Sequence, residues 1–245
     1  MNPTCLITGA SSGIGRELAL YYAAKGWTVY AVARSKDKLD ELSRQAGINA
    51  VSLELTDDGA VKAAAEQLQT DGVVLDLLLL NAGTCEYVDV ADLDLAAFDR
   101  TFAINFHAVV SSTKYFLPLL QASLTPKLAI VSSMAHFFPF TKAQAYGASK
   151  AATSYFADSL RLDLAGSGIS VHLIEPGFVD TPLTQKNDFA MPFLLPVQEA
   201  AKRVYNGLQQ GKTRLRFPLR LSLLLKTLSM LPYGLRNSVA QRMKQ

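Results

Sequence analysis

The feature that most constrains the fold of this chain is a regular alternation of short, wholly apolar runs with longer amphipathic stretches. Apolar runs of this kind are typical of parallel strands covered by helices on both faces. Strands are expected at residues 4–8, 27–33, 51–55, 74–80, 128–132, 169–175 and, at an edge, about 214–217, and helices at about 14–25, 36–45, 59–69, 95–121, 144–166 and 197–209. This order predicts one Rossmann-like α/β domain over residues 1–245, a doubly wound parallel sheet flanked by helices on both faces.

Two segments depart from the alternation. Residues 180–196 show no clear period, so a substrate lid is expected over about 180–210, with an ordinary surface loop as the alternative. An amphipathic tail is expected over about 219–245. Its apolar stretch 219–231 is interrupted by Arg220 and Lys226 and is shorter than the roughly 20 apolar residues that cross a bilayer. Packing on the protein's own core is favoured, with a partner subunit or a membrane surface as second choices.

Composition excludes several classes of function. The chain is 49% hydrophobic and 18% charged, and its net charge of +3 comes from lysines and arginines that are scattered along it, so no nucleic-acid groove is expected. No cluster of His, Cys and acidic residues has metal-ligand spacing. Cys5 and Cys85 predict no disulfide, and the chain enters its first strand with no basic stretch or cleavage site before it. A cytoplasmic location is therefore expected.

A glycine-rich turn follows the first strand. Thr8-Gly9-Ala10-Ser11-Ser12-Gly13-Ile14-Gly15 leads directly into the first helix. Glycines at such a turn let the backbone approach a pyrophosphate, and the N-terminus of the helix offers it free N–H groups. The turn predicts dinucleotide binding by Gly9, Ser11, Ser12, Gly13, Ile14 and Gly15.

The end of the second strand indicates which dinucleotide is bound. NAD-binding folds commonly place an acidic residue there to hold the adenosine ribose, whereas this chain has Ala33 followed by Arg34. Without the acid, a 2′-phosphate meets no repulsion, and a guanidinium is suited to bind it. NADP(H) is therefore preferred, with NAD(H) possible and a solvated surface Arg34 as the alternative interpretation.

Five motifs together identify a family resemblance. The glycine turn, Asn81-Ala82-Gly83, Ser133, Tyr146-Gly147-Ala148-Ser149-Lys150 and Pro176-Gly177 resemble, in order and separation, the signatures of the short-chain dehydrogenase/reductase family over about residues 4–182. The resemblance implies an oxidoreductase that moves a hydride between nicotinamide and a carbonyl or alcohol. Its implied catalytic residues are Asn105, which anchors a water in the proton relay, Ser133, Tyr146 and Lys150.

The chemistry of Tyr146 and Lys150 agrees with those roles. They are four residues apart, so a helix places both side chains on one face. A tyrosine pKa of about 10 must fall by roughly 3 units for acid–base work near neutrality. The Lys150 ammonium and the positive charge of the nicotinamide can both contribute to that shift. Ser133 would bind the substrate oxygen as charge develops on it.

The resemblance also implies the other contacts. Beyond the glycine turn and Arg34, it assigns cofactor binding to Glu54 (where the family often has Asp), Leu55, Asn81, Ala82, Gly83, Tyr146, Lys150, Pro176, Gly177, Val179 and Thr181. Residues near Ser133 and in the expected lid suggest an apolar substrate pocket, formed by Met134, His136, Phe138, Phe140 and Phe189.

Three functions stay open. The first is a carbonyl reductase or alcohol dehydrogenase with an apolar substrate. The second is a 3-oxoacyl-carrier-protein reductase, which is disfavoured because that group usually ends in a glycine-containing segment that packs between subunits, whereas this chain ends in a cationic amphipathic tail. The third is a non-catalytic NADPH-binding sensor or scaffold. Relatives commonly pair through their two long helices, here about 95–121 and 144–166, so a homodimer is expected and a tetramer is less favoured.

Overall fold

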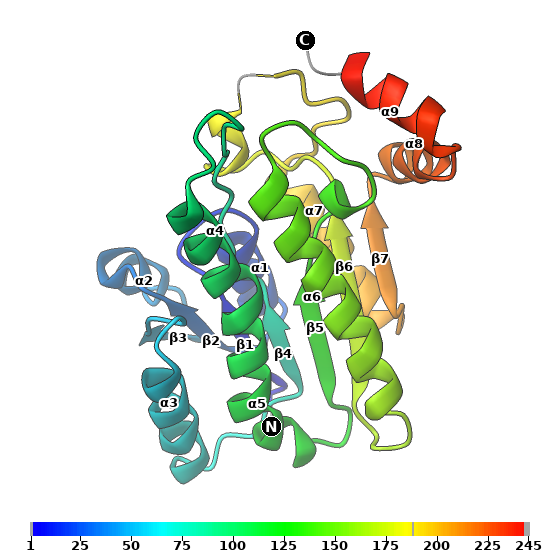
Figure 1. Ribbon diagram of the computed structural model, residues 1–245. Coiled ribbons are helices and arrows are strands. Elements are labelled where there is room, and N and C mark those ends of the chain that lie inside the picture. Colours follow the sequence, from blue (N-terminus) through cyan, green and yellow to red (C-terminus); the bar gives the residue numbers. More distant parts are fainter. Residues whose placement is uncertain (1, 188, 243–245) are drawn as a thin grey trace.

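A computed structural model describes residues 2–187 and 189–242. Its centre is a seven-stranded sheet, parallel throughout, in the order β3-β2-β1-β4-β5-β6-β7 (Figure 1). The strands are β1 (Thr4–Thr8), β2 (Thr28–Ala33), β3 (Ile48–Ser52), β4 (Leu77–Leu80), β5 (Lys127–Val131), β6 (Ser170–Pro176) and β7 (Arg214–Phe217). The predicted Rossmann-like architecture is confirmed.

Helices cover both faces of the sheet and make three layers. One face packs against α1 (Gly13–Ala24), α2 (Lys36–Leu42) and α7 (Val197–Gln209). The other packs against α3 (Asp58–Thr70), α5 (Ala108–Gln121) and α6 (Gln144–Asp163). A further helix, α4 (Leu95–Phe102), runs into α5 through a π-helical turn, Ala103–His107.

The central strand β4 shows why the apolar runs form this sheet. It consists of four leucines, all buried. Because side chains alternate along a strand, Leu77 and Leu79 enter the core on the α1 side, and Leu78 and Leu80 enter the core on the α5 side. Each buried leucine contributes about 1.5–3 kcal/mol relative to an exposed one. A strand without polar residues is stable only in this position.

The strand order creates the crevice that holds the site. Chain connections run outward on opposite sides of the β1–β4 pair, first to β2 and β3 and later to β5, β6 and β7. In open α/β sheets, ligands bind at the carboxyl ends of the strands beside such a switch point. Here those ends carry the glycine turn after β1 and Asn81-Ala82-Gly83 after β4.

Two predicted elements differ from the structure. The third strand lies at Ile48–Ser52 rather than 51–55, because its pairing with β2 begins with Ile48 opposite Val29. Leu53 and Leu55 follow the strand and are buried in the core on the α3 side. Their apolar side chains made residues 53–55 resemble part of the strand, so its predicted position was too far along the chain. The expected helix at 95–121 is continuous, but the π-helical turn interrupts its α-helical hydrogen bonding.

The expected lid divides into two parts. In the described residues 179–187 and 189–196, the regular structure is limited to a short 3-10 turn, Thr184–Lys186, and one bridge from Val179 to Leu195. From Val197 to Gln209 it is α7, whose residues Ala200 and Val204 are fully buried against the core. The second half of the predicted lid is therefore part of the core.

The C-terminal tail forms two helices, α8 (Leu219–Ser229) and α9 (Tyr233–Arg242). Leu221 and Leu225 of α8 are buried against Met134 and Phe138. The expected amphipathic helix thus packs on the core with one face. In residues 2–187 and 189–242, no helix combines the length and the hydropathy needed to cross a membrane.

Candidate active site

A cavity of about 280 Å³ opens along the carboxyl edge of the sheet. The turns that follow β1 to β6 contribute to its wall, so it runs from Arg34 at one end to Ser133 and Tyr146 at the other. The structure brings together there every residue predicted to bind the cofactor except Gly15: Gly9, Ser11, Ser12, Gly13, Ile14, Arg34, Glu54, Leu55, Asn81, Ala82, Gly83, Tyr146, Lys150, Pro176, Gly177, Val179 and Thr181.

Several lining residues were not predicted. Ala33, Leu53, Val131 and Ser132 lie at or just beyond the ends of strands, so the position of the strand ends was an available signal. The others are Ile104, on the π-helical turn, and Pro182, Leu183 and Thr184, in the irregular segment. No local pattern marks these four, since only the packing of distant elements brings them to the cavity.

The glycine turn approaches its neighbours closely. A side-chain carbon at Gly9, whose φ is +70°, would lie 2.8 Å from the Cα of Ala82. One at Gly15 would lie 2.3 Å from the carbonyl oxygen of Gly9. Gly15 therefore lets α1 pack against the turn from behind the cavity wall, which explains why it does not line the cavity.

The N-terminus of α1 suits a phosphate group. Its N-cap, Ser12, makes no side-chain hydrogen bond to the first turn of the helix, and Ser12, Gly13 and Ile14 face the cavity. The first N–H groups of a helix have no partner within the helix, and the helix dipole gives that end a partial positive charge. This cradle fits the pyrophosphate of a dinucleotide.

Thr8 joins the two loops at the switch point. Its hydroxyl accepts hydrogen bonds from the backbone N–H groups of Asn81 (2.9 Å) and Ala82 (3.1 Å). The Asn81 side chain donates in return to the Thr8 carbonyl oxygen at 3.0 Å. These bonds hold the loop after β4 against the glycine turn.

Ser133, Tyr146 and Lys150 share one wall of the cavity. Ser133 follows β5, and the other two side chains come from α6. The Tyr146 and Ser133 side chains are hydrogen-bonded to each other. Lys150 Nζ donates to the carbonyl oxygen of Val131 at 3.0 Å and lies 6.0 Å from the centre of the Tyr146 ring.

Burial sets the protonation states of this group. Removal of the Tyr146 hydroxyl from water raises its pKa to about 12, and the hydrogen bond with Ser133 offsets only part of that rise. Burial lowers the pKa of Lys150 to about 8. At pH 7 the phenol is therefore protonated and the ammonium is charged. The protein by itself does not produce the lowered tyrosine pKa that the sequence argument required.

Asn105 lies behind the cavity wall. It is fully buried on the π-helical turn and does not line the cavity. Its Oδ1 accepts from the Thr84 N–H at 2.8 Å, and its Nδ2 donates to Ser149 Oγ at 2.9 Å. These bonds connect the loop after β4 to α6, next to Lys150.

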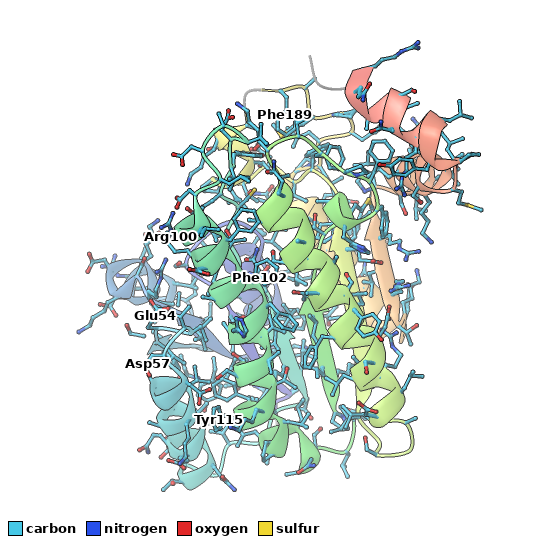
Figure 2. All side chains as sticks on the ribbon, in the orientation of Figure 1. Glu54, Asp57, Arg100, Phe102, Tyr115 and Phe189 are labelled. Carbon is cyan, nitrogen blue, oxygen red and sulfur yellow. The ribbon has the colours of Figure 1, made fainter. Side chains whose placement is uncertain are left out.

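Arg34 and Glu54 form the opposite end of the cavity. Arg34 Nη1 lies 3.4 Å from Glu54 Oε2, and the Arg34 side chain is 75% exposed. Figure 2 shows Glu54 on the α3 side of the molecule, far from Phe189 in the loop beyond the carboxyl edge. The guanidinium is free enough to move toward a ligand.

None of the five residues predicted to form the substrate pocket lines this cavity. Met134 and Phe138 are buried beneath α8, and Phe140 packs on the same cluster. His136 hydrogen-bonds Glu175, while Phe189 is 42% exposed and packs edge-on against Tyr87 and Phe178. The sequence could not reveal this, because α8 comes from the far end of the chain.

Glu175 is a buried carboxylate that the sequence analysis did not single out. Its oxygens contact His136 Nε2 at 2.8 Å, Arg216 Nε at 2.6 Å and Arg214 Nε at 3.3 Å. Burial by itself would raise the pKa of Glu175, but the hydrogen bonds from His136 and Arg216 outweigh it and lower the pKa. This cluster joins β7 to β6 and to the turn after Ser133.

We expect Glu175→Gln to destabilise the protein by about 3 kcal/mol, because it leaves the Arg216 guanidinium in a buried site without a counter-charge. Urea unfolding at pH 7 measures the effect. Glu199→Gln is the matched control, since Glu199 pairs with Arg203 at 2.7 Å on the exposed surface of α7 and should cost less than about 0.5 kcal/mol. Equal losses in the two variants would show that the buried cluster does not stabilise the fold.

Comparison with known proteins agrees with this geometry. The family model described as short chain dehydrogenase matches residues 3–191. An uncharacterized oxidoreductase of Myxococcus xanthus is 34% identical over 98% of this chain and 97% of its own. The NADPH-dependent 1-acyldihydroxyacetone phosphate reductase of Schizosaccharomyces pombe is 35% identical over 74% of this chain and 61% of its own.

A solved structure shares the fold. A short-chain dehydrogenase from Streptomyces avermitilis superimposes with a TM-score of 0.83 and 24% identity over 99% of this chain and 95% of its own. The family match covers the glycine turn, Ser133, Tyr146, Lys150 and the cavity they share. The chain belongs to the short-chain dehydrogenase family of oxidoreductases.

Proposed function

We propose that the protein is an NADP(H)-dependent oxidoreductase that interconverts a carbonyl and an alcohol, with Tyr146 as the acid or base. The observation that carries the proposal is the placement of Ser133, Tyr146 and Lys150 on one wall of a cavity whose floor is the glycine turn and the N-terminus of α1. When bound, the dinucleotide supplies or accepts the hydride.

Each side chain has a role that its position permits. Ser133 and Tyr146 can both hydrogen-bond one substrate oxygen, since their hydroxyls already lie within hydrogen-bonding distance of each other. In reduction, the protonated Tyr146 gives its proton to that oxygen as negative charge develops on it. The charged Lys150 stabilises the resulting phenolate from one helical turn away.

Tyr146 is protonated at neutral pH, because burial raises its pKa to about 12. In reduction it therefore carries the proton that the substrate oxygen takes up. In both directions, positive charge from Lys150 and, in oxidation, from the oxidised nicotinamide would have to lower that pKa.

The preference for NADP(H) rests on Arg34. Its side chain follows Ala33 at the end of β2, lines the cavity and is 75% exposed, so it can reach a phosphate by giving up its long contact with Glu54. The S. pombe relative is described as NADPH-dependent, which supports this choice. The nearby Glu54 carboxylate accepts hydrogen bonds from the Thr56 N–H and hydroxyl through Oε1, and its Oε2 contacts Arg34 Nη1 at 3.4 Å, so a phosphate would replace only this one long contact.

We expect Arg34→Ala to raise the Kd for NADPH by about 10- to 100-fold and leave the Kd for NADH within threefold, because only the 2′-phosphate loses a charge-assisted hydrogen bond. Titration of intrinsic fluorescence with each cofactor measures both constants. Arg44→Gln, an exposed change outside the cavity, is the control. A parallel loss for NADH would mean that Arg34 does not select the phosphate.

Turnover tests the catalytic proposal itself. NADPH oxidation with a panel of aldehydes, ketones and 3-oxoacyl thioesters should identify at least one substrate. Binding of NADPH without turnover of any compound would instead favour a sensor or scaffold.

We also propose a homodimer through the outer face of α6. Tyr155 and Leu162 on this helix are 79% and 77% exposed, which is unusual for large apolar side chains on one helix. Leu162→Arg should shift the protein from dimer to monomer in analytical ultracentrifugation, whereas Leu124→Arg, in the loop before β5, should not. A monomeric wild type would refute this assembly.

A further inference from the structure

Charge is distributed unevenly along the chain. The 46 residues after Glu199 hold ten of the 24 lysines and arginines and none of the 21 aspartates and glutamates. The first 199 residues therefore carry fourteen basic and 21 acidic residues, a formal charge of −7. The net charge of +3 conceals this asymmetry, because it is the sum of −7 in residues 1–199 and +10 in residues 200–245.

The helix α8 buries one face and exposes another. Leu221 and Leu225 face the protein, whereas Leu219 and Leu223 are 73% and 71% exposed. These two exposed leucines are four residues apart, so they are neighbours on the helix surface. The basic residues Arg220 and Lys226 are exposed beside them.

Large apolar side chains are also exposed beyond α8. Met230, Tyr233 and Leu235 are 85%, 75% and 60% exposed. Val239 of α9 packs against the apolar cluster that includes Leu221 and Leu225 of α8, and this contact holds α9 against the protein. Among the described residues, Arg220, Lys226, Arg236 and Arg242 form no ion pair with a carboxylate.

We propose that α8 docks on the surface of an anionic phospholipid bilayer. The docking surface, called here the tail surface, consists of the exposed side chains of Leu219, Arg220, Leu223 and Lys226 on one side of the helix. The leucines enter the boundary between headgroups and acyl chains, and the cations, which have no carboxylate partner among the described residues, bind lipid phosphates. No aspartate or glutamate follows Glu199 in the chain.

Other partners fit this surface less well. A nucleic acid would use the cations but would leave the leucines in water. In a symmetric contact between two copies, each tail surface would face the other, and cations would meet cations because the tail surface has no acidic residue. A different protein partner would need aspartates or glutamates of its own opposite these cations. A bilayer satisfies both the apolar and the cationic side chains.

Helix α8 lies at the carboxyl edge of the sheet, along which the cavity opens (Figure 1). Leu221, on the buried side of α8 away from the tail surface, packs against Gly177, which lines the cavity. About one helix diameter, roughly 10 Å, therefore separates this wall of the cavity from the docked lipid. From this we infer that the substrate is a carbonyl compound with an acyl chain that partitions into the bilayer, a step that rests on the function proposed above.

Vesicle co-sedimentation of the full chain tests the docking. We expect strong binding to vesicles of phosphatidylcholine with 30 mol% phosphatidylglycerol, about tenfold or more weaker binding to phosphatidylcholine alone, and a decrease as salt is raised. Absence of binding to the anionic vesicles would overturn the proposal, as would binding that does not depend on anionic lipid.

Two variants locate the surface. Leu223→Ser should weaken binding about tenfold, and Arg220→Gln with Lys226→Gln about 25-fold, since each cation near an anionic surface contributes roughly fivefold. Leu124→Ser and Arg44→Gln are the matched controls, because both lie at the opposite, amino edge of the sheet and should bind as the wild type does. Control variants that lose as much binding would overturn the assignment to α8.

Two further measurements separate the alternatives. Without lipid, Leu223→Ser should leave the oligomeric state in ultracentrifugation unchanged, and a smaller oligomer would show that a second copy covers the tail surface. All tail variants should keep wild-type rates with a short-chain aldehyde. With a long-chain aldehyde in anionic vesicles, they should be about tenfold slower at limiting enzyme. Docking that persists without any turnover would refute the proposed function and leave the docking intact.

Discussion

Tyr146→Phe is expected to lower kcat by 10³- to 10⁴-fold. The change removes one oxygen atom, and with it the proton that Tyr146 would give to the substrate oxygen. Lys150 remains hydrogen-bonded to the carbonyl of Val131. The ring stays in place, so the Kd for NADPH should change by less than threefold. Single-turnover NADPH oxidation together with fluorescence titration separates these two effects.

Tyr155→Phe is the matched control for this variant. Tyr155 lies on the same helix and loses the same hydroxyl, but its side chain is 79% exposed and outside the cavity. Its kcat should stay within twofold of wild type. A Tyr146→Phe enzyme with more than a tenth of the wild-type rate would mean that another group carries the proton.

Lys150→Met is expected to abolish turnover and yet stabilise the fold by about 2 kcal/mol at pH 7. The pKa of Lys150 is about 8 in the folded protein, against about 10.4 for a free lysine. Keeping the buried group charged at pH 7 therefore costs about 3 kcal/mol, and methionine removes that cost. The variant also loses the hydrogen bond from Lys150 to the carbonyl of Val131, and this loss reduces the stabilisation by about 1 kcal/mol.

The same shift gives the stability a defined pH dependence. Between about pH 8 and 10.4 the unfolded lysine binds a proton that the folded one has released, so the wild type gains stability as the pH rises through this window. Lys150→Met should not show this gain, and the two stabilities should converge near pH 10. Urea unfolding of both proteins at pH 7 and pH 9.5 checks this, with the exposed Lys202→Met as control.

A variant less stable than the wild type at pH 7 would contradict the interpretation that burial penalises the ammonium. If the expected result holds, the protein retains a destabilising charge next to Tyr146. That is the pattern of a residue kept for chemistry rather than for stability.

The sequence was most informative where one local pattern has a single stable outcome. Four consecutive leucines can bury all their side chains only in a central strand, and β4 is that strand. A chain that turns at Gly9 and enters a helix at Gly13 can form only a narrow range of turns, and the cavity lies there. The four-residue separation of Tyr146 and Lys150 placed both on one wall through helix geometry alone.

The sequence alone thus determined the fold, the cofactor cavity and the shared wall of Ser133, Tyr146 and Lys150, because strand burial, turn geometry and helical spacing act over a few residues. Only the tertiary structure decided what covers Met134 and Phe138, how Glu175 is neutralised and which face of α8 remains exposed. Each of these depends on contacts between residues separated by 39 or more positions. Contacts of that range leave no periodic signal in the chain, since the partners meet only after the sheet has formed.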